Sequence, residues 1–401
     1  MKRQCKSREI VWCLIAALGM VGSSTWATAA PWNFVRRDVS SPGVAECELP
    51  KQFEILWTYS AGGEPGSDNE DAGFEATAIV DNEIIYVGDN YGTFHAVLMD
   101  DGHAIWKQPI ENTAFLAGAA FDDQTGALYV GDANGTVWGL SNEDGHQLWE
   151  RELTGEVYAG PTLQGEDVFV TTEAGTLACL NSDDGEPRWE FKIDAPLRCT
   201  PTIAGGQILL AGCDSKLHFI DAATGKESST IDIDAPTGAT AAYRDGRVYF
   251  GTEGGTFYAI QCPQGDKPAK VLWTYRDEQR GQPIRSAASV TDSLIVYGAQ
   301  GKAIYALDPA SGELKWKVPT RSRVDSSPVI AGDQVVAATE RGVLYVIDAK
   351  SGEVNWKYDA GGSFTASPVV VDGQIIIGNG DGKLYCIGAK PDPQPKPKAE
   401  P

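Results

Sequence analysis

The 401-residue sequence lacks the excess of positive charge that proteins use to bind nucleic acids and anionic membranes. It holds 33 Lys and Arg against 55 Asp and Glu, which gives a formal net charge of -22. A surface this negative repels phosphate backbones and anionic lipid headgroups. We therefore expect no nucleic-acid partner.

The cysteine and histidine patterns of redox, haem and zinc sites are also missing. Six cysteines follow the N-terminal segment, and none belongs to a CxxC, CxxCH or adjacent-cysteine motif. This argues against thioredoxin-like, c-type haem and vicinal-disulfide sites. The four histidines do not recur at one position of the repeat described below, so neither a zinc site nor a His-dependent triad is supported. We expect no catalytic and no metal-binding residues.

The N-terminal segment predicts a secretory signal peptide over residues 1–29. Four basic residues between Lys2 and Arg8 precede an apolar run from Ile10 to about Val21, and the small residues Ala27–Ala29 follow it. The run is shorter than the ~20 residues that span a bilayer, which disfavours the alternative of an uncleaved anchor. No cysteine directly follows the run, so a lipoprotein cleavage site is absent. We expect a periplasmic or secreted protein.

Three further segments differ in composition. Residues 30–52 are mixed and Pro-containing, and we expect a linker or loose arm there. Residues 389–401 form a Pro-rich polar tail that cannot build a core and should be disordered. Everything in residues 53–388 is repetitive, and this stretch is the expected folded domain.

The repeat predicts a β-propeller. Each unit of about 40 residues contains four short strand candidates separated by Gly and Asp turns, with no helical period. In one unit these are SSPVI from Ser326, a fully apolar strand near 335, GVLYVI from Gly342, and an outer strand that carries Trp356. Turns such as Asp132–Gly135 suit hairpin geometry better than calcium binding. This pattern recurs eight times, so we predict an all-β, eight-bladed propeller of four-stranded antiparallel blades.

The last unit stops at Gly388 without an outer strand, and the missing strand is found near the other end of the chain. The segment Ile55–Ser60 (ILWTYS) closely matches Val271–Arg276 (VLWTYR). We predict that residues 55–60 complete the last blade, because closure of the ring removes unpaired strand edges.

The recurrent tryptophans are expected to be structural, packing between neighbouring blades through their large apolar area. They are Trp57, Trp106, Trp149, Trp189, Trp273, Trp316 and Trp356, and Ser229 takes this position in the fourth blade. Cys199 and Cys213 flank a hairpin that turns at Gly205–Gly206, so a cross-strand disulfide is possible, with two reduced core cysteines as the alternative.

The start of the first strand in each blade is the one repeat position where the residue type varies widely. The eight aligned residues are Glu75, Leu116, Tyr158, Arg198, Gly238, Arg285, Asp325 and Thr365. Because this position lies at the mouth of the central channel, where propellers bind ligands, we take Glu75, Tyr158, Arg198, Arg285 and Asp325 as candidate binding residues. The alternative is that these side chains are solvated and form local ion pairs.

The phrase AIYALDPASGELKW from Ala303, repeated as VLYVIDAKSGEVNW from Val343, resembles the pyrroloquinoline-quinone (PQQ) repeat. The resemblance covers about residues 53–388. It implies an eight-bladed propeller of a family that includes quinoprotein dehydrogenases and the outer-membrane assembly factor BamB. The dehydrogenases bind PQQ with calcium, using a tryptophan and two adjacent cysteines. This chain is shorter and has no adjacent cysteines, so no catalytic residue is carried over, and it looks most similar to the BamB type.

The resemblance therefore implies a non-catalytic, extracytoplasmic propeller without a cofactor. We expect a monomeric protein-binding scaffold, with the outer-membrane protein assembly machinery as the implied partner. Two alternatives stay open, namely a PQQ-dependent oxidoreductase that binds PQQ with calcium and a sensor or carbohydrate-surface binding module. The sequence does not name the partner or the face that binds it.

Overall fold

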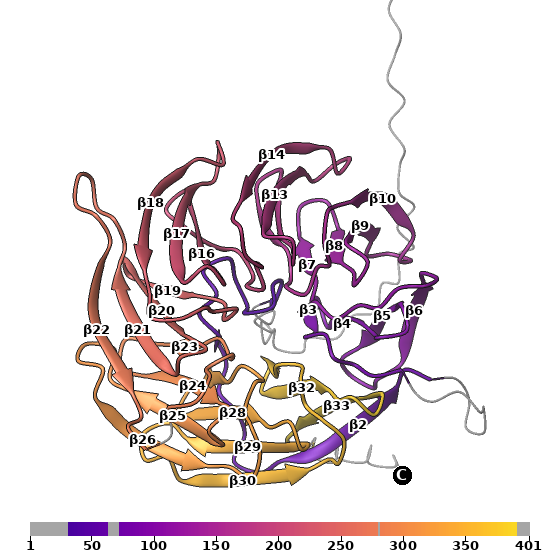
Figure 1. The fold of residues 1–401 in the computed structure, drawn as a ribbon. Coiled ribbons are helices and arrows are strands. Elements are labelled where there is room, and N and C mark those ends of the chain that lie inside the picture. Colours follow the sequence, from indigo (N-terminus) through magenta and orange to yellow (C-terminus); the bar gives the residue numbers. More distant parts are fainter. Residues whose placement is uncertain (1–30, 63–71, 280, 391–401) are drawn as a thin grey trace, which may run out of the picture.

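The computed structural model describes residues 31–62, 72–279 and 281–390 of the chain. Within these ranges every regular element is a β-strand, and no helix is long and apolar enough to cross a membrane. The strands form eight sheets around a central axis, and the four blade strands of each sheet run antiparallel (Figure 1). The prediction of an eight-bladed propeller is confirmed. The predicted signal peptide lies outside the described residues, as do all but the first two residues of the Pro-rich tail.

Blades 1 to 4 follow one another along the chain, and each runs from an inner strand at the axis to an outer strand at the rim. Blade 1 consists of β3 (Ile79–Asp81), β4 (Ile84–Gly88), β5 (Thr93–Leu98) and β6 (Ala104–Pro109). Blade 2 consists of β7 (Ala120–Asp122), β8 (Ala127–Gly131), β9 (Thr136–Ser141) and β10 (Gln147–Glu152). Blade 3 consists of β11 (Thr162–Gln164), β12 (Asp167–Thr171), β13 (Thr176–Asn181) and β14 (Pro187–Lys192). Blade 4 consists of β15 (Thr202–Ala204), β16 (Gln207–Ala211), β17 (Lys216–Asp221) and β18 (Glu227–Asp232).

Blades 5 to 8 complete the ring. Blade 5 consists of β19 (Ala242–Arg244), β20 (Arg247–Gly251), β21 (Thr256–Gln261) and β22 (Lys270–Arg276). Blade 6 consists of β23 (Ser289–Val290), β24 (Ile295–Ala299), β25 (Ala303–Leu307) and β26 (Leu314–Pro319). Blade 7 consists of β27 (Val329–Ala331), β28 (Gln334–Ala338), β29 (Val343–Asp348) and β30 (Val354–Asp359). Blade 8 contains β31 (Val369–Val371), β32 (Gln374–Gly378) and β33 (Lys383–Gly388).

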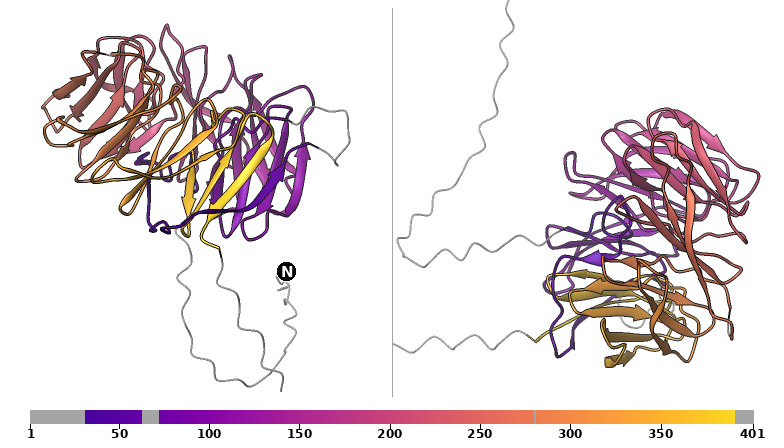
Figure 2. Two further views of the ribbon diagram at one scale, coloured as in Figure 1. Left: turned by 90° about the horizontal axis from the view of Figure 1, so that it is seen from below. Right: turned by 90° about the vertical axis from the view of Figure 1, so that its left-hand side faces the viewer.

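The fourth strand of blade 8 is β2 (Glu54–Ser60), which pairs antiparallel with β33. Trp57 lies opposite Cys386 in this pairing. Both views in Figure 2 show the C-terminal strands (yellow) beside the N-terminal part of the ring (indigo and purple). The predicted closure of the ring by residues 55–60 is therefore confirmed.

The hydrophobic core lies between the blades. The second strands are continuous apolar runs buried on both faces, as in β8, whereas outer strands such as β14 alternate between exposed and half-buried residues. Runs of the first kind are typical of strands covered on both sides. The turns between second and third strands are closed by side chains, since Asp132 Oδ1 accepts bonds of 2.9 Å from the amides of Asn134 and Thr136. These Asp residues serve the turn itself.

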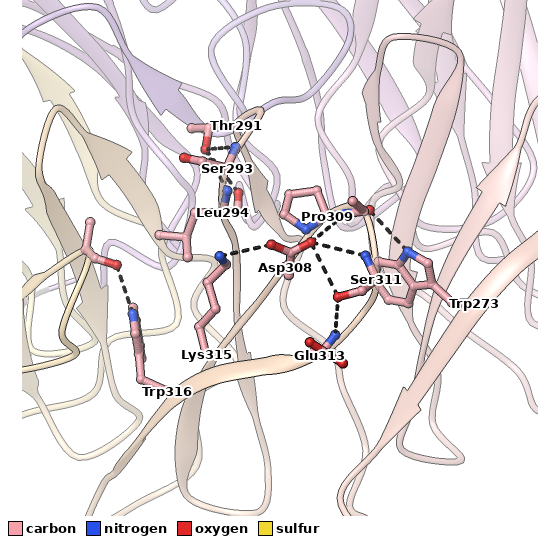
Figure 3. A network of polar contacts seen from close by, with 12 residues as sticks. Trp273, Thr291, Ser293, Leu294, Asp308, Pro309, Ser311, Glu313, Lys315 and Trp316 are labelled. Atoms are coloured by element: carbon pink, nitrogen blue, oxygen red, sulfur yellow. Dashed lines mark hydrogen bonds and ion pairs between the residues drawn. The ribbon is translucent and has the colours of Figure 1, made fainter.

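Each tryptophan joins its blade to the next one. Trp57 donates its Nε1–H to Met99 O at 2.8 Å, and its ring packs against Gly102, where a Cβ would lie 2.6 Å from the indole. Figure 3 shows the same contact between blades 5 and 6, where Trp273 donates to Pro309 O at 3.1 Å. The glycine of each Gly-x-x-x-Trp phrase thus makes room for the tryptophan of the preceding blade. Blade 4 has Ser229 instead of the tryptophan, and blade 5 carries Ala269 rather than a glycine four residues before Trp273.

Within residues 30–52, for which we expected a linker or loose arm, residues 31–50 instead form an ordered arm that crosses the centre of the ring (Figure 1). Its backbone bonds the inner strands of blades 1, 2, 4, 5, 6 and 7, and it contains β1 (Val44–Ala45), which pairs parallel with β27. The inner-strand amides that donate to the arm are those of Val80, Phe121, Ile203, Tyr243, Val290 and Ile330. The expectation was wrong because these bonds use the arm's backbone, which leaves no periodic pattern in the sequence.

The possible disulfide between Cys199 and Cys213 is absent, and both thiols are free. The β15–β16 register pairs Ala204 with Gln207, so its extension would place Cys199 opposite Gly212. A shift of one residue turns a side chain to the other face of a strand pair. The Cys213 thiol instead donates to Thr237 O at 3.6 Å.

Candidate functional site

The channel mouth is the one place where the non-repeating side chains come together. A cavity of about 200 Å³ opens there, and all eight residues of the variable repeat position line it, each four residues before the first strand of its blade rather than at its start. The five candidate residues Glu75, Tyr158, Arg198, Arg285 and Asp325 are therefore neighbours around one opening, as their repeat position predicts. Ligand binding at this opening remains a prediction.

Two arginines give one side of the mouth its positive charge. Arg198 donates from Nε and Nη2 to Glu173 at 2.6 and 3.0 Å, which raises the pKa of the arginine. Arg285 makes the same forked contact with Glu253 at 2.8 and 3.3 Å. Both glutamates belong to the second-to-third strand turn of the preceding blade. The alternative of local ion pairs is thus confirmed for these two arginines, whose side chains remain about half exposed.

The acidic side of the mouth lies on blades 7 and 1. Asp325 Oδ2 accepts a bond of 3.1 Å from Gln300, whereas its Oδ1 is buried without a hydrogen-bond partner. Burial raises the pKa of Asp325, and the Gln300 bond and the charges of Arg285 and Arg323 oppose this effect. Glu75 lies 3.5 Å from the Asn90 amide. Leu116 and Tyr158, the latter 44% exposed, complete the ring from blades 2 and 3.

A second layer of small residues lies below the mouth, two residues further along the chain in each blade and two residues before its first strand. Hydroxyl groups link neighbouring blades in this layer, since Thr240 Oγ1 accepts from Thr200 N at 3.1 Å and Ser327 Oγ accepts from Ala287 N at 2.9 Å. Blades 2 and 3 carry Gly118 and Gly160 there, and the side chain of Val35 from the arm fills the space. A Cβ on Gly160 would lie 2.3 Å from Val35 Cγ2.

The arm forms the floor of the cavity through Val35 and Arg36. Arg36 is 1% exposed, and its Nη2 donates to Pro328 O at 2.8 Å and to Ala288 O and Ser289 Oγ at 3.1 Å. Its Nε has no partner among the described residues. Burial lowers the pKa of Arg36 to about 9, so the guanidinium stays charged at neutral pH. Neither residue is predicted from the sequence, and the glycines at 118 and 160 are a signal for Val35 alone, because their missing side chains leave its space.

A second cavity, of about 350 Å³, lies between blades 6 and 7, away from the mouth, and its walls include Leu294, Lys315 and Lys350. Lys315 forms an ion pair of 2.9 Å with Asp308, which also closes the neighbouring turn (Figure 3). These contacts are structural. Over the described ranges, no three His, Cys, Asp or Glu side chains converge as metal ligands.

Comparisons with known proteins agree with this architecture. The model of a family described as "Outer membrane protein assembly factor BamB" matches residues 50–157, 133–267 and 270–390, which together span most of the chain. The chain belongs to this family. It is a PQQ-like β-propeller, as the resemblance implied. No curated protein sequence matches it significantly.

Solved structures similar to this propeller include a BamB, an alcohol dehydrogenase and a designed protein. BamB from Moraxella catarrhalis is 15% identical with a TM-score of 0.71, over 84% of this chain and 100% of that one. Quinohemoprotein alcohol dehydrogenase from Comamonas testosteroni is 14% identical with a TM-score of 0.72, over 93% and 83%. The computationally designed Ika8 protein is 15% identical with a TM-score of 0.71, over 84% and 100%. At such identities the likeness shows the fold and leaves the function to the site.

Proposed function

We propose that this family member is a non-catalytic, extracytoplasmic propeller that serves as a protein-binding scaffold. The observation that carries the proposal is that the arm fills most of the central channel. In this chain the N-terminal arm occupies the channel from below, and Val35 and Arg36 close it under a cavity of about 200 Å³. The interior is therefore small, and the larger surfaces of the ring remain for a partner.

The residues around the channel do not fit PQQ as the quinoprotein dehydrogenases bind it. Of the side chains that line the cavity, only that of Tyr158 is aromatic, and no tryptophan is available there to stack on the quinone. The sequence has no adjacent cysteines, and the described part of the chain offers no cluster of three calcium-ligating side chains. The two mouth arginines already pair with Glu173 and Glu253. This mismatch supports the scaffold and disfavours the oxidoreductase.

The more specific version of the proposal is a role in outer-membrane protein assembly. The family match over residues 50–390 supports it, because that family is described by this role. The protein, tagged and purified, would be used to capture partners from a periplasmic and outer-membrane extract. An exported acidic protein of similar size serves as the control bait. Specific recovery of outer-membrane assembly components is expected, and their absence beside the control would contradict this version.

A separate experiment addresses the oxidoreductase. The purified protein is mixed with PQQ and calcium, and absorbance, redox-dye reduction and thermal stability are followed. We expect no saturable absorbance change, no dye reduction with alcohol or aldose substrates, and an unchanged melting temperature. Substrate-dependent dye reduction would overturn the non-catalytic proposal.

A further inference from the structure

We propose that the mouth cavity binds a small zwitterion, a molecule that carries a carboxylate and an ammonium group close together, as a free amino acid does. This inference goes beyond the scaffold function and does not depend on it. It rests on the separation of charge around the mouth, on the buried cation beneath it, and on the size of the opening.

The carboxylate of such a ligand would meet the arginines of blades 4 and 6. Each guanidinium gives its Nε and Nη2 to a glutamate, and the Nη1 of Arg198 and of Arg285 has no hydrogen-bond partner among the described residues. Both side chains are about half exposed at the cavity wall. These donors can bind a carboxylate without breaking the ion pairs that hold the arginines in place, and such charged hydrogen bonds are among the stronger ones.

The ammonium group would meet the neighbouring blade. Asp325 lines the same cavity, directly after Arg285 in the order of the blades, and its Oδ1 is buried and unpartnered. The negative charge of this carboxylate would attract an ammonium group in the cavity. Glu75 adds a second negative charge on this side of the opening. These acids would repel a simple anion, and the arginines would repel a simple cation.

The floor strengthens the preference for a ligand with a carboxylate. Arg36 is a buried cation whose bonds go to backbone carbonyls and a serine hydroxyl, with no carboxylate among its partners, and its Nε is unsatisfied. A buried charge without a counter-charge is costly, so an anionic group entering the cavity above it is favoured.

The volume limits the ligand to a small molecule. At about 200 Å³ the cavity is several times the ~30 Å³ share of one water molecule, and it is below the ~300–1,000 Å³ of pockets for larger ligands. An amino acid with a short side chain suits this size, and Leu116 and Tyr158 lie on the remaining side of a mainly polar wall. We therefore take L-leucine as the first probe.

The test is isothermal titration calorimetry of the protein with L-leucine, and separately with acetate and with methylammonium, which each carry one of the two charges. We expect L-leucine to bind at least about tenfold more tightly than acetate or methylammonium, because it makes charged hydrogen bonds on both sides of the mouth. No detectable binding of L-leucine, or equal binding of acetate, would overturn the proposal.

Variants locate the site. Arg285→Ala and Asp325→Asn should each weaken L-leucine binding by about tenfold or more. Arg188→Ala is the matched control, because Arg188 is also partly exposed and paired with Glu166 and Asp167, yet it lies on the outer strand β14. Circular dichroism establishes that each variant is folded, and Arg198→Ala replaces any that is not. Wild-type affinity in the mouth variants, or an equal loss in the control, would disprove the site.

Discussion

At the scale of single residues, Gly118 and Gly160 leave the space in the ring that the arm fills. Other blades carry a hydroxyl or an alanine at this position, where the hydroxyls accept hydrogen bonds from backbone amides of the preceding blade. These two blades instead leave space for Val35. The packing therefore requires glycine at these two positions, and adding even one methyl group should destabilise the fold.

We predict that Gly160→Ala lowers the free energy of unfolding by about 1–3 kcal/mol, as overpacking of a core does. The new Cβ would lie 2.3 Å from Val35 Cγ2 and 2.9 Å from Gly118 O. Urea denaturation measures the loss. Val35→Ala in the same chain should recover part of it, since residues in contact couple in a double-mutant cycle. If the changes in unfolding free energy of the two single variants simply add in the double variant, the proposed contact between Val35 and residue 160 is contradicted.

A second residue-scale prediction concerns Asp277, whose pKa is lowered to about 2, first by the bond from Lys317 and also by the bond from Tyr305. Because the folded-state pKa lies below the ordinary value of 3.8, the stabilisation is present above about pH 4 and is lost as the pH falls toward 2. Asp277→Asn should therefore be less stable than wild type at neutral pH, by about 1 kcal/mol after solvent screening. Denaturation curves should show that the difference in unfolding free energy between wild type and Asp277→Asn is smaller at pH 2.5 than at pH 6. An equal difference at both pH values would contradict this prediction.

At the scale of elements, β2 decides whether the ring is closed. It brings Trp57 against Gly102 of blade 1, and Tyr59 Oη lies 2.9 Å from Nδ1 of the buried His95. Burial lowers the pKa of His95, whose Nε2 lies 2.8 Å from Asp89 Oδ2. This one strand thus joins blade 8 to blade 1 through both apolar and polar contacts.

Trp57→Ala should lower the free energy of unfolding by about 3–5 kcal/mol, as large aromatic truncations in cores do. Thermal and urea unfolding followed by tryptophan fluorescence and circular dichroism would measure it. The control is Ser229→Ala in β18, where the chain already lacks the tryptophan, and a change within about 0.5 kcal/mol is expected there. An unchanged melting curve for Trp57→Ala would mean that β2 does not hold the ring.

The arm makes its own prediction, because its bonds to the ring are backbone bonds. In a chain lacking residues 31–50, six inner-strand amides lose their acceptors, among them those of Ile203 and Ile330. Hydrogen exchange should become faster at these amides. Amides that bond within a blade, such as those between β16 and β17, are the internal control. Uniformly faster exchange across the ring would instead show that the arm stabilises the whole fold.

At the scale of the whole molecule, the sequence predicts what the blades share and misses what only one segment does. Eight repeats predict eight blades, and Ile55–Ser60 could be placed because it copies an outer strand. The arm could not, since Trp32 and Arg36 each contact different blades and follow no period. The mouth was located because its residues differ at one repeat position, but their pairing with Glu173 and Glu253 depends on how adjacent blades approach.

The position of β2 in the chain has a consequence for the order in which the protein can fold. The arm's β1 and the strand β2 are synthesised before the strands they pair with, because β27 and β33 come from the last third of the sequence. Their contacts are among the most distant in the sequence, and contacts of this kind slow folding. The strands β1 and β2 therefore stay unpaired, with apolar side chains and strand edges exposed, until the last two blades have been synthesised. During that interval the chain is most exposed to aggregation, and a chaperone would be most useful.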